Sequence, residues 1–141
     1  MKHLESEIQQ AAIAMVDEWF ALAHADKLIP VERKVRGVKK TFMVSPLYAN
    51  QNAYSGNPRQ GARSVKEGVR SGVWDLTLPI PAGGFHGMYI EVKTPTGSLS
   101  KNQRSWLEHY QANKYITVIC RSADDILKCV QEYMLLAEGA R

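Results

Sequence analysis

The sequence has no apolar stretch long enough to cross a membrane and no apolar segment at its start. A helix that spans a bilayer needs about 20 consecutive apolar residues, and the 141-residue chain contains no such run. The first five residues, Met-Lys-His-Leu-Glu, lack the hydrophobic centre of a secretion signal. These absences argue against a membrane protein and against export, so we expect a cytoplasmic protein with no membrane partner.

Cysteine is scarce as well, since the chain has only Cys120 and Cys129. Their spacing fits neither a zinc site nor a disulfide framework, so we interpret them as core thiols in a reducing compartment. The histidines are spread along the chain and predict no metal-ligand cluster; they are His3, His24, His86 and His109. His86 lies in a Gly-rich turn, which favours a loop position over a role as general base.

Charge is unevenly distributed along the chain, although the net charge is only +4. Residues 27–74 hold ten Lys and Arg against two acids, whereas the remainder holds eight against twelve. A basic segment of this kind indicates binding to a polyanion, because Lys and Arg neutralise phosphates. The alternative is a solvated loop without a partner.

The 45% hydrophobic content is that of an ordinary globular protein, and the length predicts one domain over residues 1–141.

Two β-prone runs, Gly72–Leu78 and Met88–Thr94, organise the rest of the chain. Side chains alternate between the faces of a strand, so Glu91 and Lys93 share one face. In the first run the same alternation places Asp75 with Val73 and Thr77, opposite Trp74, Leu76 and Leu78. Pairing the runs brings two carboxylates and an ammonium together in the middle of a sheet. Carboxylates that close repel unless a cation intervenes, and their oxygens suit Mg²⁺ or Mn²⁺.

The remaining periodicity predicts an α/β fold with a central mixed β-sheet flanked by helices. Helices are expected at residues 3–25, at 100–113 and after Ser122, the second starting with a capping box of Ser100 and Gln103. Short strands are expected at 31–35 and 41–44, the second as an edge strand of the sheet. The apolar run 115–120 favours a central strand covered on both faces. Residues 48–72 show little periodicity, and so long an irregular segment is typical of a functional or disordered loop.

An Asp on one strand followed by Glu-x-Lys on the next resembles the PD-(D/E)XK nuclease superfamily. A longer string is similar to its VRR-NUC branch, which includes small stand-alone proteins of phages and bacteria. The string consists of Gly72–Leu76, Glu91–Pro95, Gly97–Ser100 and Gln103-x-x-Trp106-Leu107. The resemblance extends from about Glu5 to Tyr133, with one departure: Trp74 stands where the family usually has Pro before the Asp.

This resemblance implies a restriction-endonuclease-like sandwich and a metal-dependent DNA endonuclease in a bacterial or phage-infected cell. Its implied substrate is branched DNA such as a four-way junction, and its implied assembly is a homodimer. Asp75 and Glu91 would hold one or two Mg²⁺ or Mn²⁺ ions with the Val92 carbonyl, and Lys93 would act on the attacking water or the phosphate. Two alternatives keep the fold without this chemistry, namely a non-catalytic DNA-binding module and a partner-binding subunit.

Two further residues receive site roles from the resemblance. Related nucleases carry a Glu on the first helix that completes the metal site, which makes Glu5 the candidate and Glu7 the alternative. An acid in the first turn of a helix also favours the macrodipole without any catalytic role. Gln103 would reach toward the site in addition to capping its helix.

The basic residues near the irregular segment are the expected DNA contacts. We refer to them as the DNA-contact set, which consists of Arg59, Arg63, Lys66, Arg70 and Lys101. Tyr48 or Tyr54 could stack on an exposed base. We therefore expect residues 48–71 to be a basic, flexible insertion in the domain that becomes ordered on DNA.

Overall fold

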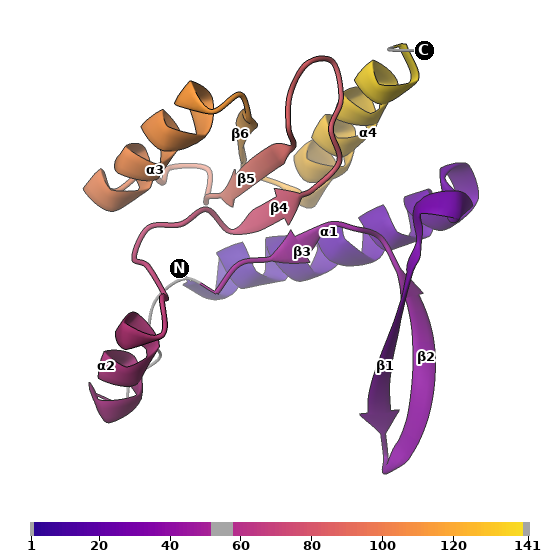
Figure 1. Ribbon diagram of the computed structural model, residues 1–141, viewed down its shortest axis with the longest axis horizontal. Coiled ribbons are helices and arrows are strands. Elements are labelled where there is room, and N and C mark those ends of the chain that lie inside the picture. The colour runs from indigo at the N-terminus through magenta and orange to yellow at the C-terminus, as the bar shows by residue number, and fades with distance from the viewer. Residues whose placement is uncertain (1, 52–57, 140–141) are drawn as a thin grey trace.

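The computed structural model describes residues 2–51 and 58–139 of the chain, which form helices on both sides of a mixed sheet (Figure 1). The helices are α1 (Lys2–Ala23), α2 (Pro58–Lys66), α3 (Lys101–Ala112) and α4 (Ala123–Gly139), with a 3-10 turn at Ala25–Lys27. The strands are β1 (Ile29–Val35), β2 (Val38–Val44), β3 (Tyr48–Ala49), β4 (Leu76–Leu78), β5 (Met88–Val92) and β6 (Ile116–Cys120). Within these described residues, no helix has the length and apolar character that crossing a bilayer requires.

The main sheet has four strands in the order β3-β4-β5-β6. The pairs β3–β4 and β4–β5 are antiparallel and β5–β6 is parallel, so the prediction of a mixed sheet is confirmed. The prediction that residues 115–120 form a central strand is wrong, because β6 is the outermost strand of this sheet. Helices α3 and α4 both pack on β6. The apolar run of β6 reflects its contacts with helices on both faces of the strand. A strand can have such contacts whether it lies at the centre or at the edge of a sheet.

The two strands predicted near residues 31–44 also differ from expectation. β1 and β2 form a separate antiparallel hairpin that projects from the body, and β3 takes the edge position that we expected of residues 41–44 (Figure 1). The chain returns to the body directly after β2, where the Ser45 N–H donates to Asp17 Oδ1 at 2.9 Å and the Leu47 side chain is buried. These contacts mark the point where the chain leaves the hairpin and joins the body.

The segment predicted as irregular contains α2, a short helix with Pro58 in its first turn. Proline is favoured there because the missing N–H has no partner in a helix start. Of its residues only Gly61 is buried. Pro58, Ala62 and Val65 do recur at helical spacing, but this pattern spans barely two turns, and the prediction of an irregular segment missed it. Tyr54 lies in 52–57, outside the described residues.

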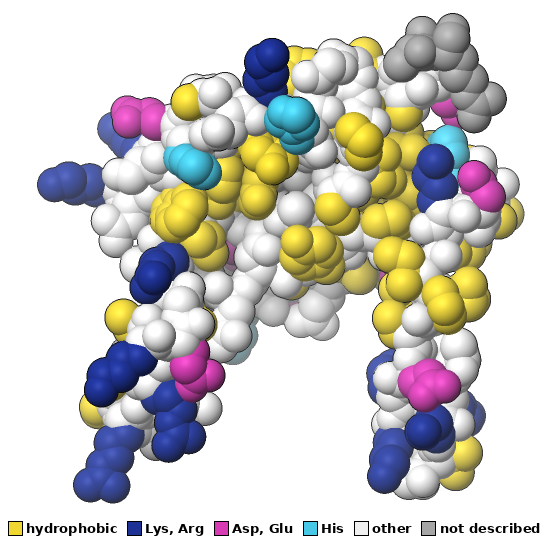
Figure 2. Space-filling model, in the orientation of Figure 1, with side chains coloured by type: hydrophobic (Ala, Val, Ile, Leu, Met, Phe, Trp, Pro, Cys, Tyr) yellow, Lys and Arg dark blue, Asp and Glu magenta, His cyan; other side chains and the backbone are white. Residues whose placement is uncertain are grey.

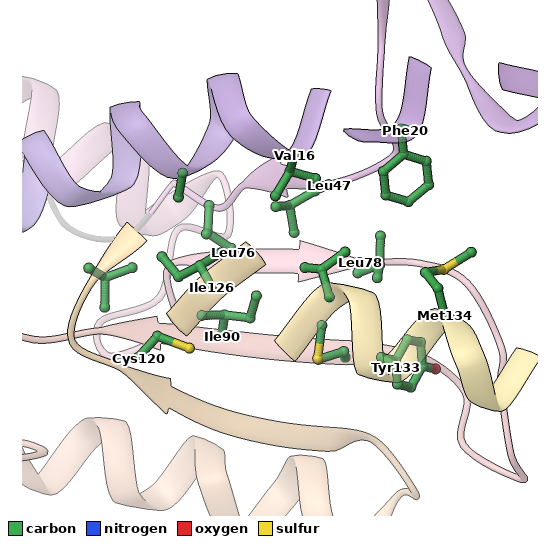
Figure 3. Close-up of a cluster of buried hydrophobic side chains, with 14 of the residues drawn as sticks. Val16, Phe20, Leu47, Leu76, Leu78, Ile90, Cys120, Ile126, Tyr133 and Met134 are labelled. Atoms are coloured by element: carbon green, nitrogen blue, oxygen red, sulfur yellow. The ribbon is translucent and has the colours of Figure 1, made fainter. Parts of the chain in front are cut away.

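The core lies on one face of the sheet, between the sheet and helices α1 and α4 (Figure 3). The predicted apolar stripe of α1 supplies Ala12, Val16 and Phe20, and that of α4 supplies Ile126, Val130, Tyr133 and Met134. Their sheet partners include Leu76, Leu78 and Ile90, all fully buried. Each large side chain buried here contributes about 1.5–3 kcal/mol. Cys120 and Cys129 are free thiols whose sulfurs lie 3.8 Å apart at this core, consistent with the interpretation from sequence.

The opposite face of the sheet is covered by α3 through aromatic contacts. Tyr89 stacks on Tyr110 of α3 with ring centroids 3.8 Å apart. Trp74 also lies on this side, since its N–H donates to the Tyr110 hydroxyl and its Nε1–H to the Gln103 carbonyl. The predicted placement of Trp74 with Leu76 and Leu78 is therefore wrong. Strand β4 begins only at Leu76, so strand alternation does not extend back to Trp74.

Candidate active site

Two carboxylates meet where β4 begins and β5 ends. Asp75 directly precedes β4, and Glu91 lies on β5 with its side chain on the face opposite the core. Val92 N–H donates to Asp75 Oδ2 at 2.8 Å, and Asp75 N–H donates to Glu91 Oε1 at 3.3 Å. Each carboxylate therefore accepts a main-chain hydrogen bond from the other's segment. This reciprocal pairing fixes both side chains against the sheet.

The second oxygen of Glu91 has two partners of its own. Gln103 Nε2 donates to Glu91 Oε2 at 2.8 Å, and Lys93 Nζ lies 3.4 Å from the same oxygen. Glu91 is only 2% exposed and Lys93 only 9%. The Glu91–Lys93 contact is therefore an ion pair largely shielded from water, and the expected grouping of Asp75, Glu91 and Lys93 is present.

Gln103 joins the carboxylates to the start of α3. Its backbone N–H donates to Ser100 Oγ at 3.1 Å, and its Oε1 accepts the Ser100 N–H at 2.9 Å. The predicted capping box is confirmed, and the other end of the same amide reaches Glu91. One side chain thus caps the helix and orients a carboxylate. Gly72 supports this arrangement, because its φ of +87° and its close approach to Asn102 leave no room for a larger residue.

The carboxylates open onto a cleft of about 620 Å³ between the sheet and the first turns of α1. Its lining comprises Asp75, Glu91 and Gln103 with Glu5, Ser6, Gln9, Gln10 and Ile13 of α1. Glu5 faces this cleft and its charge contributes to raising the pKa of Asp75. Glu7 is exposed and is not among the lining residues. The geometry therefore favours Glu5 over Glu7 as the acid of α1 that belongs to the site.

Burial makes the metal-free carboxylate pair unfavourable at neutral pH. Desolvation raises the pKa of Asp75, and desolvation together with the Asp75 charge raises the pKa of Glu91 to about 8. Lys93 and the hydrogen bonds to each carboxylate oppose these shifts without cancelling them. Two neighbouring acids with raised pKa values, Glu91 buried and Asp75 half-buried, favour either a shared proton or a bound cation.

The donors at this site fit a hard divalent cation. Val92, the last residue of β5, donates its N–H to Asp75 Oδ2, and its carbonyl remains the expected further ligand. Carboxylate and carbonyl oxygens suit Mg²⁺ or Mn²⁺. The described part of the chain holds no group of three or more His, Cys, Asp and Glu placed to bind a metal. Two carboxylates and a carbonyl match Mg²⁺, which keeps several waters when bound.

The raised pKa of Glu91 predicts how the metal-free protein responds to pH. The folded state binds the Glu91 proton more tightly than the unfolded state, whose pKa is near 4.5. This contribution to stability is therefore present below pH 4.5 and is lost as the pH rises through about 8. We expect urea unfolding in EDTA to show a larger loss of stability between pH 5 and 8 for wild type than for Glu91→Gln. If the unfolding stability of the two proteins changed equally with pH, this would contradict the raised pKa of Glu91.

Added Mg²⁺ provides the control for this prediction. A ligand that binds only the folded state stabilises it by mass action. At pH 8 we expect Mg²⁺ to raise the urea midpoint of wild type and to leave that of Glu91→Gln nearly unchanged. A response of the same size in both proteins would place the cation elsewhere on the chain.

The DNA-contact set does not line this cleft. Arg59, Arg63 and Lys66 belong to α2, which projects from the body, and Lys101 begins α3 two residues before Gln103 (Figure 1). Arg70 follows α2, and its Nη1 donates to the Val65 carbonyl at 3.2 Å. Tyr48 is 51% exposed on the edge strand β3. These positions fit contacts to an extended ligand away from the carboxylates.

Sequence reasoning missed two residues that shape the site. Asn50 donates from Nδ2 to the Trp74 carbonyl and to Thr77 Oγ1, and its N–H donates to the Asp75 carbonyl at 2.8 Å. Arg121 Nη1 donates to the carbonyls of Thr94 and Gly97, both at 2.7 Å, and so fixes the loop between β5 and α3. Their partners are distant in sequence, and no local pattern marks either residue.

Comparisons with known proteins point to one family. The family model described as the VRR-NUC domain matches residues 25–124, a range that includes Asp75, Glu91, Lys93 and Gln103 but not Glu5. Among solved structures, a chain titled "VRR_NUC domain protein" has a TM-score of 0.65 and 19% sequence identity. The alignment covers 94% of this chain and 88% of that one, and at this identity it supports the fold. A search of curated proteins found no match.

Proposed function

The chain belongs to the VRR-NUC family of the PD-(D/E)XK superfamily, and we propose that it is a divalent-metal-dependent DNA endonuclease. Membership supports a nuclease-type function in DNA processing. The observation that carries the proposal is the pair of buried Glu91 and half-buried Asp75 at a cleft, held by reciprocal main-chain hydrogen bonds. Two carboxylates this close repel each other and destabilise the folded protein. Such pairs are typical of sites where their charge binds a ligand or takes part in a reaction.

Each site residue has a distinct role in the proposed hydrolysis. Asp75, Glu91 and the Val92 carbonyl would hold the Mg²⁺ or Mn²⁺, and Glu5 would add a carboxylate from the α1 side of the cleft. When bound, the cation would lower the pKa of a water and offset the charge of the phosphate. Gln103 keeps Glu91 in orientation through the 2.8 Å hydrogen bond to Oε2. Lys93 supplies a fixed positive charge beside Glu91, where a partly dry site makes it most effective on an attacking water or a phosphate oxygen.

The substrate and assembly follow from the resemblance together with the charge distribution. We infer that residues 1–141 act as one domain on branched DNA such as four-way junctions, in the cytoplasm of a bacterial or phage-infected cell. The basic insertion at residues 48–71 holds the phosphates of that DNA. A homodimer suits paired cuts across a symmetric junction, because a twofold axis relates its two active sites.

A cleavage panel with purified protein tests this function directly. Duplex, single strand, flap, splayed arm and four-way junction of matched sequence are incubated with Mg²⁺, with Mn²⁺ and with EDTA. We expect metal-dependent cuts and the highest rate on the four-way junction. Binding without cleavage in any metal would favour the non-catalytic DNA-binding module, and full cleavage in EDTA would remove the metal from the mechanism. Equal rates on all substrates would overturn the preference for branched DNA.

The basic face of α2 provides a separate prediction about binding. Neutralising Arg63 and Lys66 with Gln removes two exposed charges and keeps Arg70, whose contact with the Val65 carbonyl supports the end of α2. Each lost phosphate contact lowers the slope of log affinity against log salt by about 0.9. We expect a slope lower by about two units, measured by fluorescence anisotropy in Ca²⁺. An unchanged slope would identify α2 as a solvated segment without a DNA role.

A further inference from the structure

The β1–β2 hairpin carries a dense group of positive charges at its outer end. Five of the eight residues 33–40 are Lys or Arg, and none is acidic. These five, which we call the hairpin cations, are Arg33, Lys34, Arg36, Lys39 and Lys40, and all are exposed. In Figure 2 they form one of two basic projections on the same side of the molecule, and α2 forms the other. The hairpin therefore extends the basic surface beyond the residues of the DNA-contact set.

The register of the hairpin places like charges directly opposite each other. Arg33 pairs with Lys40 and Lys34 pairs with Lys39 across the two strands. Like charges in this position destabilise a sheet, and a two-stranded hairpin is only marginally stable to begin with. The one ion pair between Lys39 and Glu32, at 3.6 Å, is exposed and offsets little. These like-charge pairs lower the stability of the unbound protein, and an anionic ligand bound to the hairpin would remove the repulsion.

The cations surround the end of the hairpin on every side. Paired residues share a face of the ribbon, so Arg33 and Lys40 lie on one face and Lys34 and Lys39 on the other. Arg36 sits in the two-residue turn with φ of +51°. The Arg33 guanidinium also lies 4.1 Å above the Phe42 ring, a contact that restricts its side chain. A flat partner would meet one of these faces, whereas a ligand that engages both must enclose the ribbon.

The major groove of DNA is such a ligand. It admits a two-stranded β-ribbon, and both of its walls are phosphate backbones that attract Lys and Arg. We propose that the β1–β2 hairpin is a DNA-binding arm that enters a groove of the substrate, away from the carboxylate cleft. This inference rests on the proposed function, since it assumes that DNA is the ligand. The hairpin contributes affinity and orientation and takes no part in the chemical step.

The variant Lys34→Gln/Lys40→Gln tests the arm with little disturbance. It breaks both like-charge pairs and keeps the Lys39–Glu32 and Arg33–Phe42 contacts. We expect duplex affinity in Ca²⁺ to fall at least about tenfold at 0.1 M salt and the salt slope to fall by about two units. The melting temperature should stay equal or rise, because the repulsion is gone. A lower melting temperature with lost binding would contradict the inference, since it would indicate structural damage.

A matched control removes two charges elsewhere on the surface. Lys114 and Lys128 are exposed residues at the end of α3 and on α4, and Asn suits the φ of +62° at Lys114. Lys114→Asn/Lys128→Gln should therefore bind DNA with nearly the wild-type affinity and slope. Equal losses in both double variants would mean that net charge, and not the hairpin, sets the affinity.

The remaining outcomes separate this inference from the proposed function. Wild-type protein that neither binds nor cleaves DNA would overturn the function itself. Wild-type protein that does both, alongside a hairpin variant of unchanged affinity and slope, would overturn only the arm. The hairpin cations would then serve to prevent association at the strand edges. Loss of a dimer by the hairpin variant in sedimentation without DNA would instead assign the hairpin to a contact between two copies.

Chemical protection provides a measurement that needs no variant. Duplex DNA added to wild-type protein should shield Lys34 and Lys40 from acetylation by a soluble ester, with Lys128 as the unshielded reference. Mass spectrometry of peptides from the free and bound protein quantifies each site. Equal labelling of Lys34 and Lys40 with and without DNA would overturn the inference.

Discussion

Asp75→Asn should abolish Mg²⁺-dependent DNA cleavage while the protein keeps its fold. Asn can still accept the Val92 N–H through its side-chain oxygen, which preserves the 2.8 Å hydrogen bond. The charge that holds the cation is lost, and with it the source of the activated water. We expect the single-turnover rate to fall by more than about a hundredfold, the scale of losing one group that stabilises transition-state charge.

Stability and metal binding distinguish this loss from unfolding. Removing one of two neighbouring acids relieves their repulsion, so the unfolding midpoint of Asp75→Asn in EDTA should equal or exceed that of wild type. Titration calorimetry with Mn²⁺ should show binding to wild type and much weaker binding to the variant. Glu108→Gln, which changes an exposed acid on α3, is the matched control and should cleave normally. A fully active Asp75→Asn protein would remove Asp75 from the site.

Lys93→Met should lose cleavage and keep DNA binding. Methionine fills much of the space of the lysine stem, so the 9% exposed position stays packed. If Lys93 acts on the water or the phosphate, the single-turnover rate at saturating Mg²⁺ should fall about a hundredfold or more. Affinity for DNA in Ca²⁺ should change by only a few-fold, because one lysine is a small part of the phosphate contacts.

The position of Lys93 makes a counter-ion role the main competing explanation. Its Nζ lies 3.4 Å from Glu91 Oε2 and outside the lining of the cleft. A lysine that only balances Glu91 becomes redundant once a cation is bound, and Lys93→Met would then cleave normally at high Mg²⁺. A loss that disappears as Mg²⁺ is raised would therefore assign Lys93 to metal binding. A joint loss of binding and cleavage would make it a DNA contact.

Strand alternation and helix-capping spacing were sufficient to predict how several residues of the candidate site are placed. Two-residue alternation predicted that Glu91 and Lys93 share a face, and they form an ion pair. The Ser100–Gln103 spacing predicted a capping box, and it is present. These features depend on residues two or three positions apart, where backbone geometry sets the distance between side chains. The catalytic roles of these residues remain predictions, which the variants above test.

The failures came where a local pattern had to specify a long-range arrangement. The apolar run of β6 predicted two covered faces but not its place at the edge, because strand order depends on pairing with distant β5. The two strands near residues 31–44 were predicted, but no local pattern showed that they pair with each other and not with the main sheet. The nine-residue helix α2 was missed because the helical spacing of Pro58, Ala62 and Val65 spans barely two turns and the helix buries almost nothing.

The sequence by itself determined the family, the mixed α/β class and the neighbouring positions of Glu91 and Lys93, because short motifs and strand periodicity carry that information. The resemblance implied that an acid of the first helix and Gln103 reach the site. Only the tertiary structure decided that Asp75 binds the main chain of β5, that Glu5 and not Glu7 lines the cleft, and that Gln103 donates to Glu91 Oε2. It also decided that the hairpin cations surround a projecting ribbon. The residues that line this cleft lie up to 98 positions apart in the chain, as Glu5 and Gln103 do. Their distances are set by the packing of α1 and α3 on the sheet, which no local pattern encodes.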